Sequence, residues 1–242
     1  MQSRYPGNTT WLWCPTDTLE QWNNNRATRA RDLERYGWWE PQEIQYRFNS
    51  QGFRSVEFDA TAPGILALGC SITLGIGIKQ RHSWCELVSG ALGLPCWNLG
   101  QGGAAMDTLF RMAEHWIPRL RPRMVIMLCP PNRFEILDPQ GRAILLLPAE
   151  QTRGQGPGTP PPHLQAFHRE WATNPENMRL QDLKNLWAVK HLCDSLGTPL
   201  HHWTWADMFN DLVDDYGRDL VHPGAKKHRV FAERVLREIR SA

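Results

Sequence analysis

The sequence lacks any long apolar run, and its apolar stretches fall well short of the ~20 residues that a membrane-spanning helix needs. Residues 1–7 contain no apolar segment of the kind that marks a secretory signal. These two absences predict a protein without a membrane span that is located in the cytoplasm.

Closely paired cysteines are also absent, because none of the six cysteines forms a C-x-x-C pair. Without such pairs neither a disulfide framework nor a zinc site is indicated, and no other metal site is expected. Several of the cysteines fall in apolar runs, so we expect them to be buried free thiols. They are Cys14, Cys70, Cys85, Cys96, Cys129 and Cys193.

The chain has no strong excess of either charge, since 27 Lys and Arg residues face 25 Asp and Glu residues. The basic residues are spread along the sequence, which argues against binding to nucleic acid or to a membrane surface. The densest basic stretch, residues 226–229, is better explained as the solvated start of a helix than as a binding site. The oligomeric state is left open.

Hydrophobic residues, by contrast, make up 41% of the 242 residues, which is enough for one full-sized α/β domain over residues 1–242. Twelve tryptophans are present, and several lie in residues 1–60. Trp faces can form sugar-binding platforms, but packing is the preferred explanation. We therefore expect residues 1–60 to be a Trp-rich extension that wraps the main domain. Within it, Asp17 is expected to cap a helix, with Glu20 completing a capping box.

The remaining chain alternates strands with helices. Buried strands are predicted at residues 65–68, 95–99, 124–129 and 199–205. Helices are predicted at residues 83–93, 107–120, 176–196 and after residue 224. This alternation indicates βαβ units, and hence a parallel sheet with helices on both faces.

Two helices and one irregular region carry more detailed expectations. The helix at 176–196 is expected to bury a stripe of Leu180, Leu183, Leu186 or Trp187, and Cys193. The final helix is expected to bury Phe231, Val235 and Ile239. Residues 138–178 contain a Pro/Gly stretch at 154–162 and are expected to form a surface insertion that serves as a lid.

Distinctive polar or small residues follow each predicted strand. Ser71 follows the first strand, Gly103 the second and Asn132 the third, and Asp219 and His222 lie after the fourth. The carboxyl ends of parallel strands meet at one edge of a sheet, which is where α/β proteins place their chemistry. The sequence therefore predicts that these five residues gather in one site.

This combination of residue types suits acyl transfer. The hydroxyl of Ser71 is a weak nucleophile until a base takes its proton, and His222 can act as that base. Asp219, three residues earlier, can hold the imidazole in the required tautomer. The backbone N–H groups of Ser71 and Gly103 and the amide side chain of Asn132 can stabilise the oxyanion. No cofactor is needed for this chemistry.

The motifs that carry these residues resemble those of the SGNH/GDSL hydrolases. They are Gly69-x-Ser71-x-Thr73-x-Gly75, Asn98-x-Gly100-x-Gly102-Gly103, Asn132 after a strand, and Asp219-x-x-His222-Pro223-Gly224. The resemblance covers roughly residues 64–240. It implies a flavodoxin-like, three-layer α/β/α fold with a mostly parallel sheet, and ester hydrolysis through an acyl-enzyme. It also implies that Ser71 is the nucleophile, that Gly103 and Asn132 are oxyanion donors, and that Asp219 and His222 complete the triad.

Two positions depart from the family pattern. Cys70 stands where the family has an aspartate, and a thiol cannot brace the turn as a carboxylate would, so support must come from elsewhere. A buried thiol is a better explanation of Cys70 than an alternative nucleophile. Arg133 stands where the family again has an aspartate. It can pair with Glu135, be solvated or bind an anionic substrate group, and the first two are favoured.

The leading hypothesis is a serine-dependent ester hydrolase that acts on a small acyl ester. One alternative is a carbohydrate O-deacetylase, which the Trp content and the polar insertion favour. Another is a catalytically silent carbohydrate-binding module on the same fold, which Cys70 and Arg133 favour. Acyl transfer to an acceptor other than water is also compatible with the triad. The acyl group and the leaving group are left open.

Overall fold

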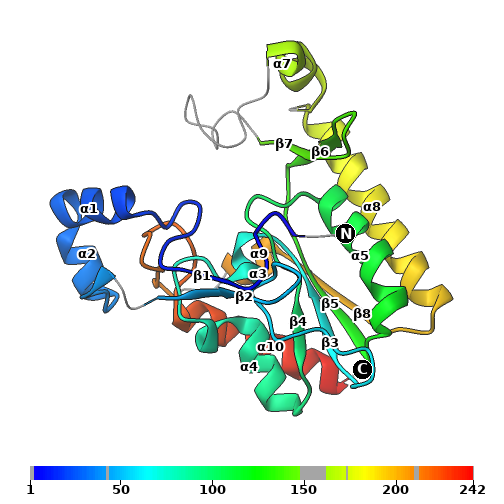
Figure 1. Ribbon diagram of the computed structural model, residues 1–242, viewed down its shortest axis with the longest axis horizontal. Coiled ribbons are helices and arrows are strands. Elements are labelled where there is room, and N and C mark those ends of the chain that lie inside the picture. Colours follow the sequence, from blue (N-terminus) through cyan, green and yellow to red (C-terminus); the bar gives the residue numbers. More distant parts are fainter. Residues whose placement is uncertain (1–2, 42–43, 148–161, 173, 210–212, 242) are drawn as a thin grey trace.

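A four-stranded parallel sheet forms the centre of the computed structural model, which describes residues 3–41, 44–147, 162–172, 174–209 and 213–241 (Figure 1). The strands are β3 (Ile65–Leu68), β4 (Cys96–Asn98), β5 (Met124–Cys129) and β8 (Leu200–Thr204). Their order in the sheet is β4-β3-β5-β8. Of these four strands, β3 comes first in the chain, and it lies between β4 and β5, which come second and third. This is the order of the flavodoxin-like doubly wound fold.

The two central strands are buried because they are apolar throughout. All four residues of β3 are at most 1% exposed, and β5 is buried from Val125 to Leu128. A parallel strand covered on both faces needs such a continuous apolar run. The register pairs Leu66 with Trp97 on one side and with Val125 on the other.

Two pairs of helices cover the faces of the sheet. One pair is α4 (Trp84–Leu92) and α10 (Ala225–Ser241), and the other is α5 (Met106–Leu120) and α8 (Pro175–Ser195). Figure 1 shows the first pair below the sheet and the second pair beside it on the opposite face. The three-layer α/β/α fold expected from the sequence is therefore confirmed.

Local capping explains where the helix on the first face begins and ends. The hydroxyl of Ser83 accepts a hydrogen bond from the N–H of Glu86 at 3.4 Å, and Gly93 ends α4 in the left-handed conformation with φ 64°. The predicted final helix is α10, and it buries Phe231 and Val235 as expected.

The predicted buried stripe of α8 is largely wrong. Its buried residues are Met178, Asn185, Val189 and Cys193. Of the predicted stripe only Cys193 is buried, and Leu186 packs partly buried against the core. Leu180, Leu183 and Trp187 are 49%, 41% and 62% exposed. The helix is turned so that Gln181 and Asn185 donate hydrogen bonds to Asp107 of α5, at 2.5 and 2.9 Å. Polar pairing across the helix interface, which hydrophobic periodicity does not show, thus selects the inner face.

A short hairpin follows β5, formed by β6 (Phe134–Leu137) and β7 (Ala143–Leu146). Three short helical turns come before α8, at Pro162–Leu164, Gln165–Phe167 (α7) and His168–Ala172. Residues 154–161 of the Pro/Gly stretch lie outside the described residues, and the role of this region as a lid stays a prediction.

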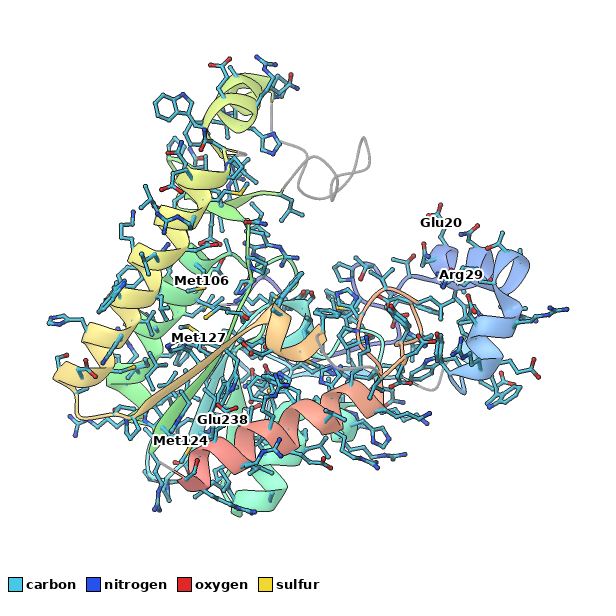
Figure 2. All side chains as sticks on the ribbon, turned by 180° about the vertical axis from the view of Figure 1, so that it is seen from behind. Glu20, Arg29, Met106, Met124, Met127 and Glu238 are labelled. Atoms are coloured by element: carbon cyan, nitrogen blue, oxygen red, sulfur yellow. The ribbon has the colours of Figure 1, made fainter. Side chains whose placement is uncertain are left out.

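The N-terminal residues build a second, smaller core. Strands β1 (Thr9–Trp11) and β2 (Tyr46–Phe48) pair antiparallel, and helices α1 (Leu19–Thr28) and α2 (Ala30–Arg35) lie at the end of an arm (Figure 1). In Figure 2, Glu20 and Arg29 lie on this arm, away from Met124 and Met127 on β5. The members of the second core include Trp22, Trp38, Tyr46, Leu74, Ile76, Ile78 and Leu220. The extension therefore packs against the segments that follow Ser71 and Asp219.

The prediction that Asp17 caps a helix is wrong. The cap of α1 is Thr18, whose hydroxyl accepts a hydrogen bond from the N–H of Gln21 at 3.0 Å. Asp17 is instead 1% exposed and forms an ion pair with Arg218, with distances of 2.9 and 2.7 Å. A buried guanidinium without a carboxylate partner would be strongly destabilising, whereas water can satisfy the N–H groups of an exposed helix end. Asp17 therefore pairs with Arg218 and does not cap α1.

The remaining composition-based expectations have mixed outcomes. All six cysteines are free thiols, and five of them are buried. The basic stretch 226–229 does begin a helix, and Lys226 and Arg229 are exposed as expected, but Lys227 and His228 are only 6% and 0% exposed. Nζ of Lys227 lies 5.1 Å from the ring centre of Tyr216 and 5.4 Å from that of Phe209, at the end of α9 (Trp205–Phe209). Among the described helices, none has the length and apolar character to cross a membrane.

Candidate active site

Ser71 lies directly beyond the carboxyl end of β3. It is the first residue of the four-residue helix α3 (Ser71–Leu74), which ends at Gly75 with φ 79°. The N–H groups of Gly75 and Ile76 donate to the carbonyl of Ser71 at 3.0 and 3.1 Å. Ser71 is 6% exposed, and its hydroxyl contacts the thiol of Cys70 at 3.8 Å.

A buried arginine supports the turn that holds Ser71. The guanidinium of Arg54 donates to the carbonyls of Leu74, Gly75 and Ile78 at 3.3, 2.5 and 3.0 Å. It also lies 4.4 Å from the centre of the Tyr46 ring, a cation–π distance. The bracing that Cys70 cannot supply is thus present, and it comes from a residue that the sequence did not single out.

The second glycine-rich turn packs directly against the first. The amide of Asn98 donates to the carbonyl of Thr73 at 2.7 Å and accepts from the N–H of Gly100 at 2.9 Å. A side chain at Gly100 would collide with the backbone of Thr73 and Leu74, so glycine permits this close approach. The two turns therefore form one rigid unit at the sheet edge.

Asp219 and His222 form a close pair before α10. Oδ2 of Asp219 lies 2.6 Å from Nδ1 of His222, and Oδ1 accepts from the N–H groups of Val221 and His222 at 3.1 and 3.0 Å. Burial acts to raise the pKa of Asp219, but the charge and hydrogen bonds of its His222 and Val221 partners outweigh it and lower that pKa. Asp219 is therefore a carboxylate held toward the imidazole.

The Asp219 loop and the Ser71 turn are neighbours. The N–H of Arg218 donates to the carbonyl of Gly77 at 2.8 Å, and a Cβ at Gly77 would lie 3.0 Å from Oδ1 of Asp219. Among the described residues, no hydrogen bond joins Ser71 to His222. Catalytic hydrogen bonds are often long before substrate binds, so the arrangement is compatible with a triad whose last contact is still open.

Gly103 lies in the second turn, under the hairpin. Its φ is 73°, and a Cβ placed there would lie 2.9 Å from Cδ1 of Leu145 on β7. The N–H of the preceding Gly102 donates to the hydroxyl of Tyr5 at 3.2 Å. Tyr5, from the N-terminal segment, is therefore an unforeseen neighbour of the expected oxyanion donor.

Asn132 follows β5 but faces solvent. It has a φ of 57°, and its N–H donates to Oδ2 of Asp182 at 3.3 Å. Its side-chain amide makes no hydrogen bond to any described residue. Among the described residues, no hydrogen bond therefore joins this amide to Ser71 or to Gly103.

Asp182, on α8, is a second unforeseen residue here. Burial raises its pKa to about 6; the N–H of Asn132 acts to lower it, and the nearby Asp107 carboxyl to raise it. Because its pKa is higher in the folded state, this carboxylate lowers stability as pH rises from about 4 to about 6. We expect Asp182→Asn to raise the free energy of unfolding at pH 8 by about 1 kcal/mol, a value reduced for partial solvent exposure.

This gain should largely vanish at about pH 3, where Asp182 is mostly protonated in both states. Urea unfolding of wild type and Asp182→Asn at about pH 3 and pH 8 measures the difference. Asp194→Asn, on an exposed part of the same helix, serves as the control. An Asp182→Asn gain equal at both pH values would contradict the assigned titration.

Arg133 is buried, so the interpretation as a solvated side chain is wrong. It is 6% exposed and donates from Nη1 to the carbonyl of Ala104 at 3.3 Å. Its guanidinium also lies 4.6 Å from the centre of the Trp205 ring. These contacts tie the strand-end residues after β5 to the turn that carries Gly103.

Glu135 forms a buried network with two other arginines. Its carboxylate lies 2.9 Å from Arg4 and 2.7 Å from Arg111, and accepts from the hydroxyl of Thr108 at 2.7 Å. Arg4 comes from the N-terminal segment, so this network is a second tie between that segment and the sheet edge.

The N-terminal segment also contacts the Asp219 loop itself. The hydroxyl of Thr16 donates to Oδ2 of Asp219 at 3.2 Å, and the amide of Asn25 donates to the carbonyl of Asp219 at 3.1 Å. About 200 residues separate these partners in sequence, so no local motif could have revealed them. No cluster of three His, Cys, Asp or Glu side chains that could hold a metal occurs among the described residues.

No protein-family model matches the chain, and no curated protein sequence matches it. Solved structures similar to it include a psychrotrophic esterase from Pseudoalteromonas, with 14% identity, a TM-score of 0.39 and coverage of 74% of this chain and 97% of that one. Another is a carbohydrate acetylesterase from Sinorhizobium meliloti, with 15% identity, a TM-score of 0.38 and coverage of 74% and 99%. A third is a member of the lipolytic G-D-S-L family from Veillonella parvula, with 16% identity, a TM-score of 0.35 and coverage of 73% and 97%.

Proposed function

We propose that this protein is a serine-dependent ester hydrolase that acts on a small acyl ester through an acyl-enzyme intermediate. The observation that carries the proposal is the buried Asp219 carboxylate, 2.6 Å from Nδ1 of His222, in a loop that packs against the Ser71 turn. A surface histidine without a chemical role is not expected to have a buried carboxylate partner or to lie in a loop next to a turn that carries a serine.

In this proposal the Asp219 contact assigns the roles of the two ring nitrogens of His222. Because Nδ1 faces Asp219, Nε2 is the nitrogen that takes the proton from Ser71. The Ser71 oxygen attacks the ester carbonyl carbon, and His222 then gives the proton to the departing alkoxide. Water repeats the sequence on the acyl-enzyme, so the products are an alcohol and a carboxylic acid.

The tetrahedral intermediates need hydrogen-bond donors for their oxyanion. The N–H groups of Ser71 and Gly103 are the proposed backbone donors, with Asn132 as the side-chain donor. Asn132 must turn inward for this role, since it is exposed and its amide makes no hydrogen bond to Ser71 or Gly103. Asp219 stays ionised and stabilises the imidazolium of His222.

Covalent labelling tests the proposal directly. A fluorophosphonate should form a phosphonyl bond to the Ser71 oxygen with loss of fluoride, because only an activated serine reacts with this reagent. Peptide mapping by mass spectrometry locates the label. Cys70→Ala should label like wild type, which separates Ser71 from its neighbouring thiol. Labelling elsewhere, or none, would contradict the proposal.

A carbohydrate acetyl ester is the alternative substrate. A groove lined by aromatic residues Phe134, Phe167 and Trp171 supports it, and Trp171 is 60% exposed and can present its face to a sugar ring. Release of acetate from acetylated oligosaccharides, compared with simple acyl esters of increasing length, distinguishes the two substrates. Sugar binding without any labelling of Ser71 would favour a silent binding module instead.

A further inference from the structure

We propose that Thr16 of the N-terminal segment is a positioning residue, which holds the carboxylate of Asp219 in its orientation toward His222. This inference rests on the proposed function, because it assigns Thr16 a role in that acid–base pair. It makes the N-terminal segment part of the working site and not only a cover for the domain.

The first observation is the geometry of Asp219. Its Oδ1 is held by the two backbone N–H groups of its own loop, whereas Oδ2 faces His222. The Thr16 hydroxyl donates to that same Oδ2 at 3.2 Å and lies 3.5 Å from Nδ1 of His222. An ionised carboxylate only accepts hydrogen bonds, so the hydroxyl proton points at Asp219. Thr16 is the second donor to the oxygen that orients the imidazole.

The second observation is the backbone of Thr16, whose φ is 73°. This residue sits in a tight turn in which Cys14 and Asp17 form an antiparallel bridge, with Pro15 at its first central position. A turn of this kind favours glycine or asparagine where φ is positive. A β-branched side chain is strained there, and strain of this sort gathers at functional sites. Local stability alone would favour another residue at position 16.

The third observation is how firmly this turn is attached to the Asp219 loop. Asp17, which follows Thr16, pairs with Arg218, which precedes Asp219. The N–H of Cys14 donates to the carbonyl of Asp17 at 3.0 Å and closes the turn. Thr16 and Asp17, adjacent on one loop, therefore contact Asp219 and Arg218, adjacent on the other. The ion pair of Asp17 with Arg218 holds the two loops at the separation that the weaker hydrogen bond from Thr16 to Asp219 requires.

The hydroxyl has a predictable effect on the pair. With Thr16 in place, Oδ2 is held by two donors, the Thr16 hydroxyl and Nδ1–H of His222. Loss of the hydroxyl leaves Oδ2 freer to turn away from the ring, so the Nδ1 proton should exchange faster with water. The other ionisable groups around the pair are Cys14, His228 of α10, and the paired Asp17 and Arg218. None of them is altered by a change at Thr16.

Three variants separate the hydroxyl from the shape of the residue. Thr16→Val keeps the volume and lacks the hydroxyl, Thr16→Ser keeps the hydroxyl, and Thr16→Gly lacks both but suits the backbone. We expect kcat/KM to fall about tenfold in Thr16→Val and Thr16→Gly, as for loss of one hydrogen bond to a charged group, and to stay near wild type in Thr16→Ser. The melting temperature of Thr16→Gly should not fall with its activity.

The readout that a merely structural role would not change is the proton NMR signal of Nδ1–H of His222. This proton should exchange faster with water in Thr16→Val and Thr16→Gly, and at the wild-type rate in Thr16→Ser. Equal exchange rates in all four proteins would overturn the inference, as would a Thr16→Ser variant that behaves like Thr16→Val. The NMR measurement needs no substrate, so absence of ester hydrolysis would refute the proposed function and leave this test intact.

Discussion

Ser71→Ala is expected to lower the rate of p-nitrophenyl acetate hydrolysis by about 10³-fold or more, to the level left by binding and oxyanion donors alone. The reason is that the Ser71 hydroxyl, at the start of α3 and next to the Asp219 loop, is the nucleophile of the proposed mechanism. Among the described residues, the Ser71 hydroxyl makes one hydrogen bond, at 3.8 Å to the Cys70 thiol, so its loss should leave the fold unchanged. Steady-state kinetics measures the loss of activity.

The control for this variant is Cys70→Ala, which removes the adjacent side chain and should keep most of the activity. Far-UV circular dichroism and the melting temperature show that both variants are folded. A Ser71→Ala protein with near wild-type activity would contradict the serine mechanism. Loss of activity in Cys70→Ala but not in Ser71→Ala would identify the thiol as the nucleophile.

Asp17→Ala is expected to lower the free energy of unfolding by about 3–5 kcal/mol, because it leaves the Arg218 guanidinium buried without its carboxylate. The side chains of this pair are 0% and 1% exposed. Arg218 also donates to the carbonyls of Leu12 and Pro41 and lies 4.1 Å from the Trp13 ring centre, and these contacts leave it no route to solvent. Urea unfolding measures the change.

The matched control is Glu176→Ala, which breaks a pair of the same bidentate geometry at the surface. Arg179 contacts Glu176 at 2.8 and 2.7 Å, but both side chains are more than half exposed, so no measurable loss is expected. The double variant Asp17→Ala/Arg218→Met should be more stable than Asp17→Ala alone, because no buried charge remains. Equal losses in Asp17→Ala and Glu176→Ala would show that burial does not decide the strength of this pair.

Much of the fold could be predicted because its signals are local. The continuous apolar run Ile65–Leu68 predicts a buried parallel strand, and Ser83 and Gly93 mark the two ends of α4. Each of these features depends on neighbours a few residues away. The same holds for the contact of Asp219 with His222, since three residues of one turn bring their side chains together.

The failed predictions concern side chains with a choice of partners. Asp17 fits a helix cap by sequence, yet the buried Arg218 takes it, and the Leu180 side of α8 is apolar, yet Asp107 draws the opposite side inward. In both cases a local pattern competes with a polar group that must be satisfied once it is buried. The pattern says nothing about that group, because it lies far away in the chain.

The sequence by itself determined the alternating strands and helices, the place of Ser71 directly after β3, the spacing that pairs Asp219 with His222, and the departure at Cys70. Only the tertiary structure decided what holds these residues in place: Arg54 under the Ser71 turn, Tyr5 beside Gly102, and Thr16 on Asp219. The physical reason is that these supports are hydrogen bonds between segments that lie up to 203 residues apart in the chain. Such contacts have no periodicity and no fixed spacing in the sequence, so they can be recognised only in the folded structure.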